Sequence, residues 1–141
     1  MMRNSDKRPS IDEIKERLRP LFKEEELELI LLFGSVASRI SHKKSDIDLA
    51  FLFDKPLDIL ALTNKVTKLL HTDNVDVVDL KRANPLLKFS IAKNGKLLYE
   101  RSPGLFNEFY SFAFRRYIDT KKLRSAQGET IKNFLEEKGL L

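Results

Sequence analysis

The chain contains no cysteine, which excludes disulfide bonds, thiolate nucleophiles and the usual cysteine-based zinc sites. It has no apolar run near the roughly 20 residues that a membrane-spanning helix needs. The longest such run, residues 29–33, is typical of a buried strand. Residues 1–9 are polar and lack the apolar centre of a signal peptide, so we expect a flexible leader and a cytoplasmic protein.

The chain does have enough apolar material for one folded domain. Its 141 residues are 42% hydrophobic and include 10 phenylalanines, which suits a globule with a substantial core. The net charge of +5 is compatible with binding polyphosphates or an acidic partner. It is equally compatible with a Lys-rich and Glu-rich surface that keeps the protein soluble.

The spacing of apolar residues predicts alternating helices and strands. Ser10 and Glu13 form a capping-box pattern that begins a helix, which Pro20 ends or kinks. In the first strand we expect Leu27, Leu29, Leu31 and Phe33 to share one face. Strands are expected at 27–33, 46–53, 75–80 and 96–99, and later helices at 57–71, 84–93, 105–118 and 130–138. This alternation by itself would suggest a parallel sheet.

The most informative segment joins Gly34 and Ser35 to Asp46 and Asp48 across ten intervening residues. Alternate side chains of a strand share a face, so the two carboxylates should project together, with Cα atoms roughly 6.5–7 Å apart. Carboxylates that close repel each other, and hard cations such as Mg²⁺ or Mn²⁺ relieve the repulsion. Ala50 is next on that face, and its small side chain is expected to leave room above the site.

Gly34 and Ser35 complete a possible phosphate site. A glycine at a strand end lets phosphate oxygens approach backbone N–H groups, and the serine hydroxyl adds a donor. A phosphate cradle beside metal-binding carboxylates is what nucleotidyl transfer requires. We therefore predict a Mg²⁺-dependent nucleotidyltransferase. The ordinary alternatives are a simple turn at Gly34 and a solvated aspartate pair at the start of a strand.

These residues resemble the signature of the polymerase-beta-like nucleotidyltransferase superfamily, and within it the minimal nucleotidyltransferases paired with HEPN-domain proteins in prokaryotes. The resemblance covers about residues 26–100. It implies an α/β (α+β) fold with a mixed sheet flanked by helices. We accordingly divide the chain into the leader at 1–9, a nucleotidyltransferase domain at 10–100, and a helical C-terminal extension at 101–141 that packs on the domain or on a partner.

The resemblance also implies the metal site: two Mg²⁺ ions held by Asp46, Asp48 and Asp76, with ATP as the nucleotide donor. The third carboxylate of the family lies on a later strand in a Val-Asp-hydrophobic context, which Asp76 matches. Strand patterning alone does not separate Asp76 from Asp79, because the two lie on opposite faces and each has apolar neighbours. By its position, Asp76 is the expected acceptor of the attacking hydroxyl's proton.

Four basic residues lie between the two motifs: Arg39, His42, Lys43 and Lys44. They either hold the triphosphate or form an ordinary solvated loop. We take Gly34, Ser35, Arg39 and Lys44 as the candidate nucleotide-binding residues. Minimal members of the family often carry Ala-Arg-Gly soon after Gly-Ser, whereas this chain has Ala37-Ser38-Arg39. The arginine is displaced by one position and the glycine is missing, which leaves a phosphate contact by Arg39 open.

The helix expected at 105–118 carries aromatic and aliphatic residues over roughly two-thirds of its circumference, more than a surface helix needs. We expect it to be buried on two sides, by its own domain and the last helix or by another chain. Basic residues in and after this helix either contact RNA or form an exposed face. They are Arg115, Arg116, Lys121, Lys122 and Arg124.

For function, the resemblance implies AMP transfer from ATP to a tyrosine of a HEPN ribonuclease toxin, which would make this chain the antitoxin and a partner in a hetero-oligomer. Neither a membrane nor a nucleic acid is required. One alternative is nucleotidylation of a small molecule such as an aminoglycoside, against which the short length argues. Another is a non-catalytic antitoxin that acts by binding, which the displaced Arg39 favours.

Overall fold

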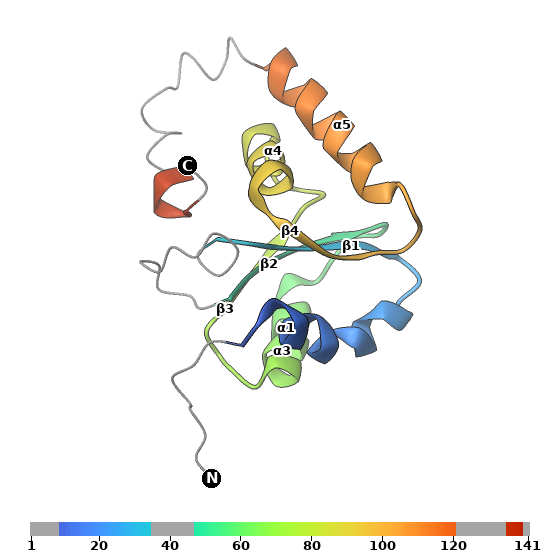
Figure 1. The fold of residues 1–141 in the computed structure, drawn as a ribbon, viewed down its shortest axis with the longest axis vertical. Helices are drawn as coiled ribbons and strands as arrows, with labels where there is room; N and C mark the ends of the chain where they lie inside the picture. Colours follow the sequence, from blue (N-terminus) through green and yellow to red (C-terminus); the bar gives the residue numbers. More distant parts are fainter. Residues whose placement is uncertain (1–8, 35–46, 121–134, 140–141) are drawn as a thin grey trace.

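The computed structural model describes residues 9–34, 47–120 and 135–139, and these contain one mixed β-sheet (Figure 1). Strand order in the sheet is β3-β2-β1-β4. Strand β1 (Leu27–Phe33) is antiparallel to β2 (Ile47–Phe53) and to β4 (Lys96–Glu100), whereas β2 is parallel to β3 (Val75–Asp79). The mixed sheet implied by the family resemblance is confirmed. The parallel sheet suggested by the alternation of elements is wrong, because only β2 and β3 are joined as a parallel pair through a helix.

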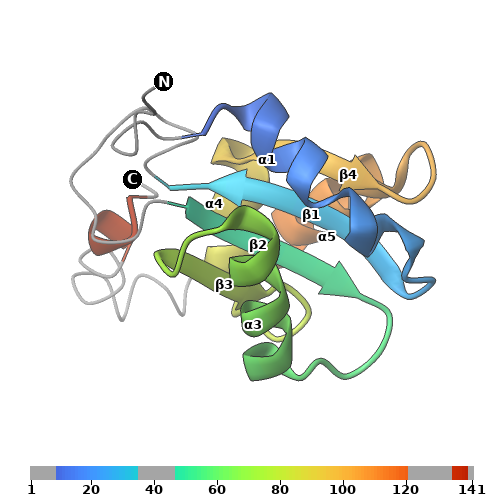
Figure 2. The same cartoon turned by 90° about the horizontal axis from the view of Figure 1, so that it is seen from below.

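Helices cover both faces of the sheet (Figures 1 and 2). On one face lie α1 (Ile11–Arg17), the short 3₁₀ helix η1 (Arg19–Lys23) and α3 (Ile59–Leu70). On the other lie α4 (Pro85–Asn94) and α5 (Leu105–Asp119). Each face has its own buried apolar cluster, so the sheet is the central layer of three.

The capping box at the start of α1 is confirmed. The Ser10 hydroxyl accepts a hydrogen bond from the Glu13 backbone N–H at 3.1 Å, and the Glu13 carboxylate accepts one from the Ser10 N–H at 2.9 Å. The helix ends at Arg17, and Pro20 lies in the first turn of η1, as its locked backbone predicts. Ile14 is fully buried and attaches α1 to the sheet.

The prediction that Leu27, Leu29, Leu31 and Phe33 share one face of β1 is wrong. Leu31 and Phe33 belong to the apolar cluster under α4, whereas Leu27 belongs to the cluster under α1 and α3. The pairing of β1 with β2 shifts register between Leu27 and Leu29. Such an irregularity adds a residue to one strand and reverses the alternation of its side chains. The shift is tolerated because β1 is a central strand whose residues are buried on both faces.

The two faces of β2 differ as the sequence predicts. The apolar cluster facing α1 and α3 includes Ile47, Leu49, Phe51 and Phe53. The opposite face carries Asp48 and Ala50. The room expected above Ala50 is absent, because this residue is fully buried in a cluster that includes residues of α4 and the C-terminal Leu135. Ala50 does lie on the predicted face of β2, but neighbouring side chains fill the space expected above it.

Helix α5 packs on α4 through aromatic rings. Phe89 of α4 lies 4.5 Å from the ring of Tyr117 and 6.0 Å from that of Tyr110, measured between centroids. On the other side, the side chains of Phe112 and Ile118 are 59% and 47% exposed. The described residues cover one side of α5, and the second cover predicted for it, by the last helix or by another chain, stays a prediction. Residues 130–134 of the last predicted helix lie outside the described residues.

Among the described residues, no helix is long and apolar enough to span a membrane.

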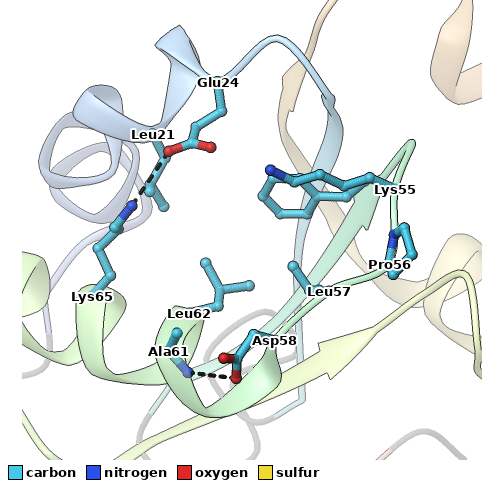
Figure 3. A pocket seen from close by; sticks show the side chains of 10 residues that line it. Leu21, Glu24, Lys55, Pro56, Leu57, Asp58, Ala61, Leu62 and Lys65 are labelled. Atoms are coloured by element: carbon cyan, nitrogen blue, oxygen red, sulfur yellow. Dashed lines mark hydrogen bonds and ion pairs between the residues drawn. The ribbon is translucent and has the colours of Figure 1, made fainter.

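A hollow of about 290 Å³ lies between η1, the C-terminal end of β2 and α3 (Figure 3). Its charged side chains engage neighbouring groups: Lys65 pairs with Glu24 at 3.3 Å, and Asp58 accepts a hydrogen bond from the Ala61 N–H at 3.1 Å. The hollow is lined by Phe53, five residues along β2 from Asp48, which is roughly 16 Å along an extended strand. It is therefore separate from the carboxylates discussed below.

Replacing Ser10 by Ala should lower the free energy of unfolding by about 1 kcal/mol, because the first turn of α1 loses its side-chain cap. The expected fall in melting temperature is about 3 °C for a domain of this size. Ser10→Thr keeps a hydroxyl that can cap the helix and is the matched control. Equal melting temperatures for the Ala and Thr variants would show that the cap does not stabilise the fold.

Candidate active site

The end of β1 and the beginnings of β2 and β3 meet at one edge of the sheet (Figure 2). Phe33 pairs with Asp48 across β1 and β2, and Asp48 pairs with Asp76 across the parallel strands β2 and β3. Paired residues of neighbouring strands point to the same face, with Cα atoms roughly 5 Å apart. The fold thus brings together two of the three carboxylates singled out from the sequence.

Gly34 lies directly against Asp48. Its backbone has φ +79°, a conformation that favours glycine. A Cβ atom built at this position would overlap the Asp48 carboxylate and lie 2.9 Å from its Cγ. From its place in the sequence, this glycine is expected to let phosphate approach the backbone. The structure adds a second reason for it, which is room for a carboxylate that is itself fully buried.

Asp79 lies elsewhere. It pairs with Phe51, three residues further along β2 than Asp48. Its Oδ1 accepts a hydrogen bond from the Lys81 backbone N–H at 3.1 Å, which holds the turn after β3. Burial and the charge of Arg116 lower the pKa of Lys88 in α4, and the negative charge of Asp79 opposes that lowering. The geometry therefore favours Asp76 over Asp79 as the neighbour of Asp48, a choice that the strand pattern left open.

A cation from the C-terminal end of the chain contacts Asp76. The Lys138 ammonium lies 3.4 Å from Asp76 Oδ2, with side-chain exposures of 36% and 39%. Leu135, three residues earlier, is 4% exposed and packs in the cluster that contains Phe33 and Ala50. Sequence analysis did not single out Lys138, because residues 62 positions apart give no spacing signal of their contact.

The other candidate residues lie outside the described residues: Ser35, Arg39, Lys44 and Asp46. Within 9–34, 47–120 and 135–139, no group of three Asp, Glu or His side chains that could hold a metal ion is found. The described part of the site is thus the pair Asp48 and Asp76, with Gly34 on one side and Lys138 on the other.

The charges of this pair fit a divalent cation. Two ionised carboxylates whose charges were as close as these Cα atoms, roughly 5 Å, would repel by about 3 kcal/mol at an effective dielectric constant of about 20. An ion pair as exposed as that of Lys138 and Asp76 contributes only about 0.2–1 kcal/mol. The ion pair of Lys138 with Asp76 therefore does not by itself offset a repulsion of that size. Oxygen-only donors from two strands match the preference of Mg²⁺ for one or two carboxylates plus substrate phosphates.

Replacing Gly34 by Ala should destabilise the protein more than the same change at Gly104. Both glycines have positive φ, +79° and +95°, so both variants carry the backbone strain of about 1–2 kcal/mol. A Cβ at Gly104 has no heavy atom within 4 Å, whereas at Gly34 it meets Asp48. We expect Gly34→Ala to cost about 1–3 kcal/mol beyond Gly104→Ala in urea denaturation. Equal costs would mean that Asp48 moves aside freely.

Comparison with known proteins agrees with this geometry. Residues 16–104 match the family model described as polymerase beta, nucleotidyltransferase. The protein adenylyltransferase MntA of Aphanizomenon flos-aquae is 30% identical over 148 aligned positions, covering 96% of this chain and 99% of that protein.

Two solved structures, both toxin–antitoxin complexes, share the fold. One, a toxin–antitoxin with AMP-PNP, contains a chain with 28% identity and a TM-score of 0.70, covering 88% of this chain and 99% of that one. The other is a tri-AMPylated Shewanella oneidensis HEPN toxin in complex with its MNT antitoxin. It matches with 26% identity and a TM-score of 0.68, covering 86% of this chain and 98% of that one. With carboxylates paired across β2 and β3 and a family match over most of its length, the chain belongs to the polymerase beta nucleotidyltransferase family.

Proposed function

We propose that this protein is an adenylyltransferase that moves AMP from ATP to a tyrosine hydroxyl of a HEPN toxin and acts as the antitoxin of that pair. The observation that carries the proposal is the pairing of Asp48 with Asp76 beside Gly34. The relative from Aphanizomenon is named as a protein adenylyltransferase, and a related complex holds an AMPylated HEPN toxin. The cytoplasmic location expected from the sequence is part of the same proposal.

In this proposal Asp48, Asp76 and Asp46 hold the Mg²⁺ ions. Mg²⁺ held by these residues would neutralise charge on the triphosphate and lower the pKa of the acceptor hydroxyl. Asp48 is fully buried and suits a fixed ligand, whereas the Asp76 side chain is 39% exposed and open to a substrate. Gly34 and Ser35 would present backbone N–H groups and a hydroxyl to the phosphates, with Arg39 and Lys44 adding positive charge.

The chemical step has a simple balance. The tyrosine oxygen attacks the α-phosphorus of ATP, a new P–O bond forms, and the bond from that phosphorus to the pyrophosphate oxygen breaks. The tyrosine proton passes to a carboxylate oxygen of Asp76, which is the general base in this scheme. The products are AMP-tyrosine and pyrophosphate. In this scheme the tyrosine would be presented by the partner protein.

The proposal is tested by incubating the chain with α-labelled ATP, Mg²⁺ and a HEPN protein encoded beside its gene. Label should appear on the HEPN protein at a tyrosine. Asp48→Asn and Asp76→Asn should each reduce the rate roughly 10²- to 10⁴-fold, because each removes a charge worth several kcal/mol to the transition state.

Asp79→Asn is the matched control, since it changes a carboxylate of the same strand that lies away from Asp48. It should keep most of the activity. Labelling that survives Asp48→Asn would contradict the proposal. Loss of activity in Asp79→Asn with retention in Asp76→Asn would exchange the roles of the two residues. If Asp48→Asn still neutralised the toxin fully, the chain would act by binding rather than by AMP transfer.

A further inference from the structure

We infer that Lys138 is a built-in counter-ion of Asp76. In the metal-free protein the Lys138 ammonium binds the Asp76 carboxylate, and a divalent cation displaces the ammonium when it binds. This inference rests on the proposed function, because it takes Asp76 to be a metal ligand. It adds the C-terminal turn to the site and makes Lys138 a positioning residue that acts through Asp76.

The first support is the way in which the C-terminal turn is held. Leu135 is buried in the apolar cluster that also contains Phe33, the partner of Asp48 on β1, and Ala50, the next residue on the same face of β2. This anchor fixes the turn beside the edge of the sheet where β2 and β3 begin. Lys138 lies three residues beyond the anchor, and its long side chain reaches Asp76 Oδ2 at 3.4 Å. The contact thus comes from a segment attached to the core near the carboxylates.

The second support is the charge that the ammonium meets. Asp76 is the register partner of the buried Asp48, so the Lys138 ammonium contacts the exposed member of a pair of neighbouring carboxylates. Both side chains of the ion pair are more than one-third exposed. A pair this accessible can exchange its cation without opening the core, which a fully buried pair could not do.

The third support is competition for one oxygen atom. Mg²⁺ binds carboxylate oxygens at about 2.0–2.1 Å in a near-octahedral shell. An ammonium group at the same Asp76 oxygen occupies part of that shell and is repelled by the divalent charge. Lys138 and the metal therefore compete for Asp76, and each weakens the binding of the other.

The experiment measures Mn²⁺ affinity without nucleotide, by titration calorimetry and by the paramagnetic resonance signal of free Mn²⁺. Lys138→Met should bind Mn²⁺ about two- to five-fold more tightly than the unmodified protein, since an exposed ion pair is worth that factor. Lys138→Arg retains the positive charge and should stay near the unmodified value. Lys65→Met removes a comparable ion pair with Glu24 remote from the site and should leave Mn²⁺ affinity unchanged.

Thermal unfolding gives a second readout. Lys138→Met should lower the melting temperature in EDTA, and saturating Mn²⁺ should remove most of the difference from the unmodified protein.

Unchanged or weaker Mn²⁺ binding by Lys138→Met would overturn the inference. Weaker ATP-analogue binding with unchanged Mn²⁺ affinity would overturn it as well and would make Lys138 a phosphate contact. Asp48→Asn and Asp76→Asn separate this failure from that of the proposed function. If these two variants bind Mn²⁺ as tightly as the unmodified protein, the proposed metal site and the role of Lys138 both fail. If they lose Mn²⁺ binding while Lys138→Met has unchanged Mn²⁺ affinity, only the role of Lys138 fails.

Discussion

A carboxylate buried at the start of a central strand places strict demands on everything around it. Asp48 has no exposed surface, and its neighbours in the sheet are Phe33 and Asp76. Burying a charge is expensive unless surrounding groups compensate for it. Gly34 leaves room for this carboxylate, and the cation of Lys138 contacts its register partner Asp76. The arrangement of the site thus depends first on how the buried Asp48 carboxylate is accommodated.

The mixed topology brings these groups to one place. Because β1 runs antiparallel to β2, the C-terminal end of β1 meets the N-terminal ends of β2 and β3. Gly34, Asp48 and Asp76 therefore share one edge of the sheet. In a fully parallel sheet the end of β1 would lie at the opposite edge from Asp48, and no site would form. The direction of a single strand thus decides whether the two motifs can act together.

The later half of the chain closes the same face of the sheet. Helix α4, helix α5 and Leu135 pack over Phe33 and Ala50, so the cluster that supports the carboxylates is completed by the C-terminal segments. The aromatic contacts of Phe89 with Tyr110 and Tyr117 join α5 to α4. Through this packing the C-terminal extension is physically connected to the site, which is how a lysine near the chain end comes to face Asp76.

The sequence by itself determined the strands, the capping box at Ser10 and the glycine that follows β1. These features depend on neighbours in the chain: apolar alternation, a hydroxyl three residues from a carboxylate, and a glycine where a strand ends. Only the tertiary structure decided the direction of β1, the register shift near Leu27, the pairing of Asp76 rather than Asp79 with Asp48, and the approach of Lys138. Each of these depends on which strands and turns become neighbours in space. Local spacing carries no information about contacts between residues far apart in the chain.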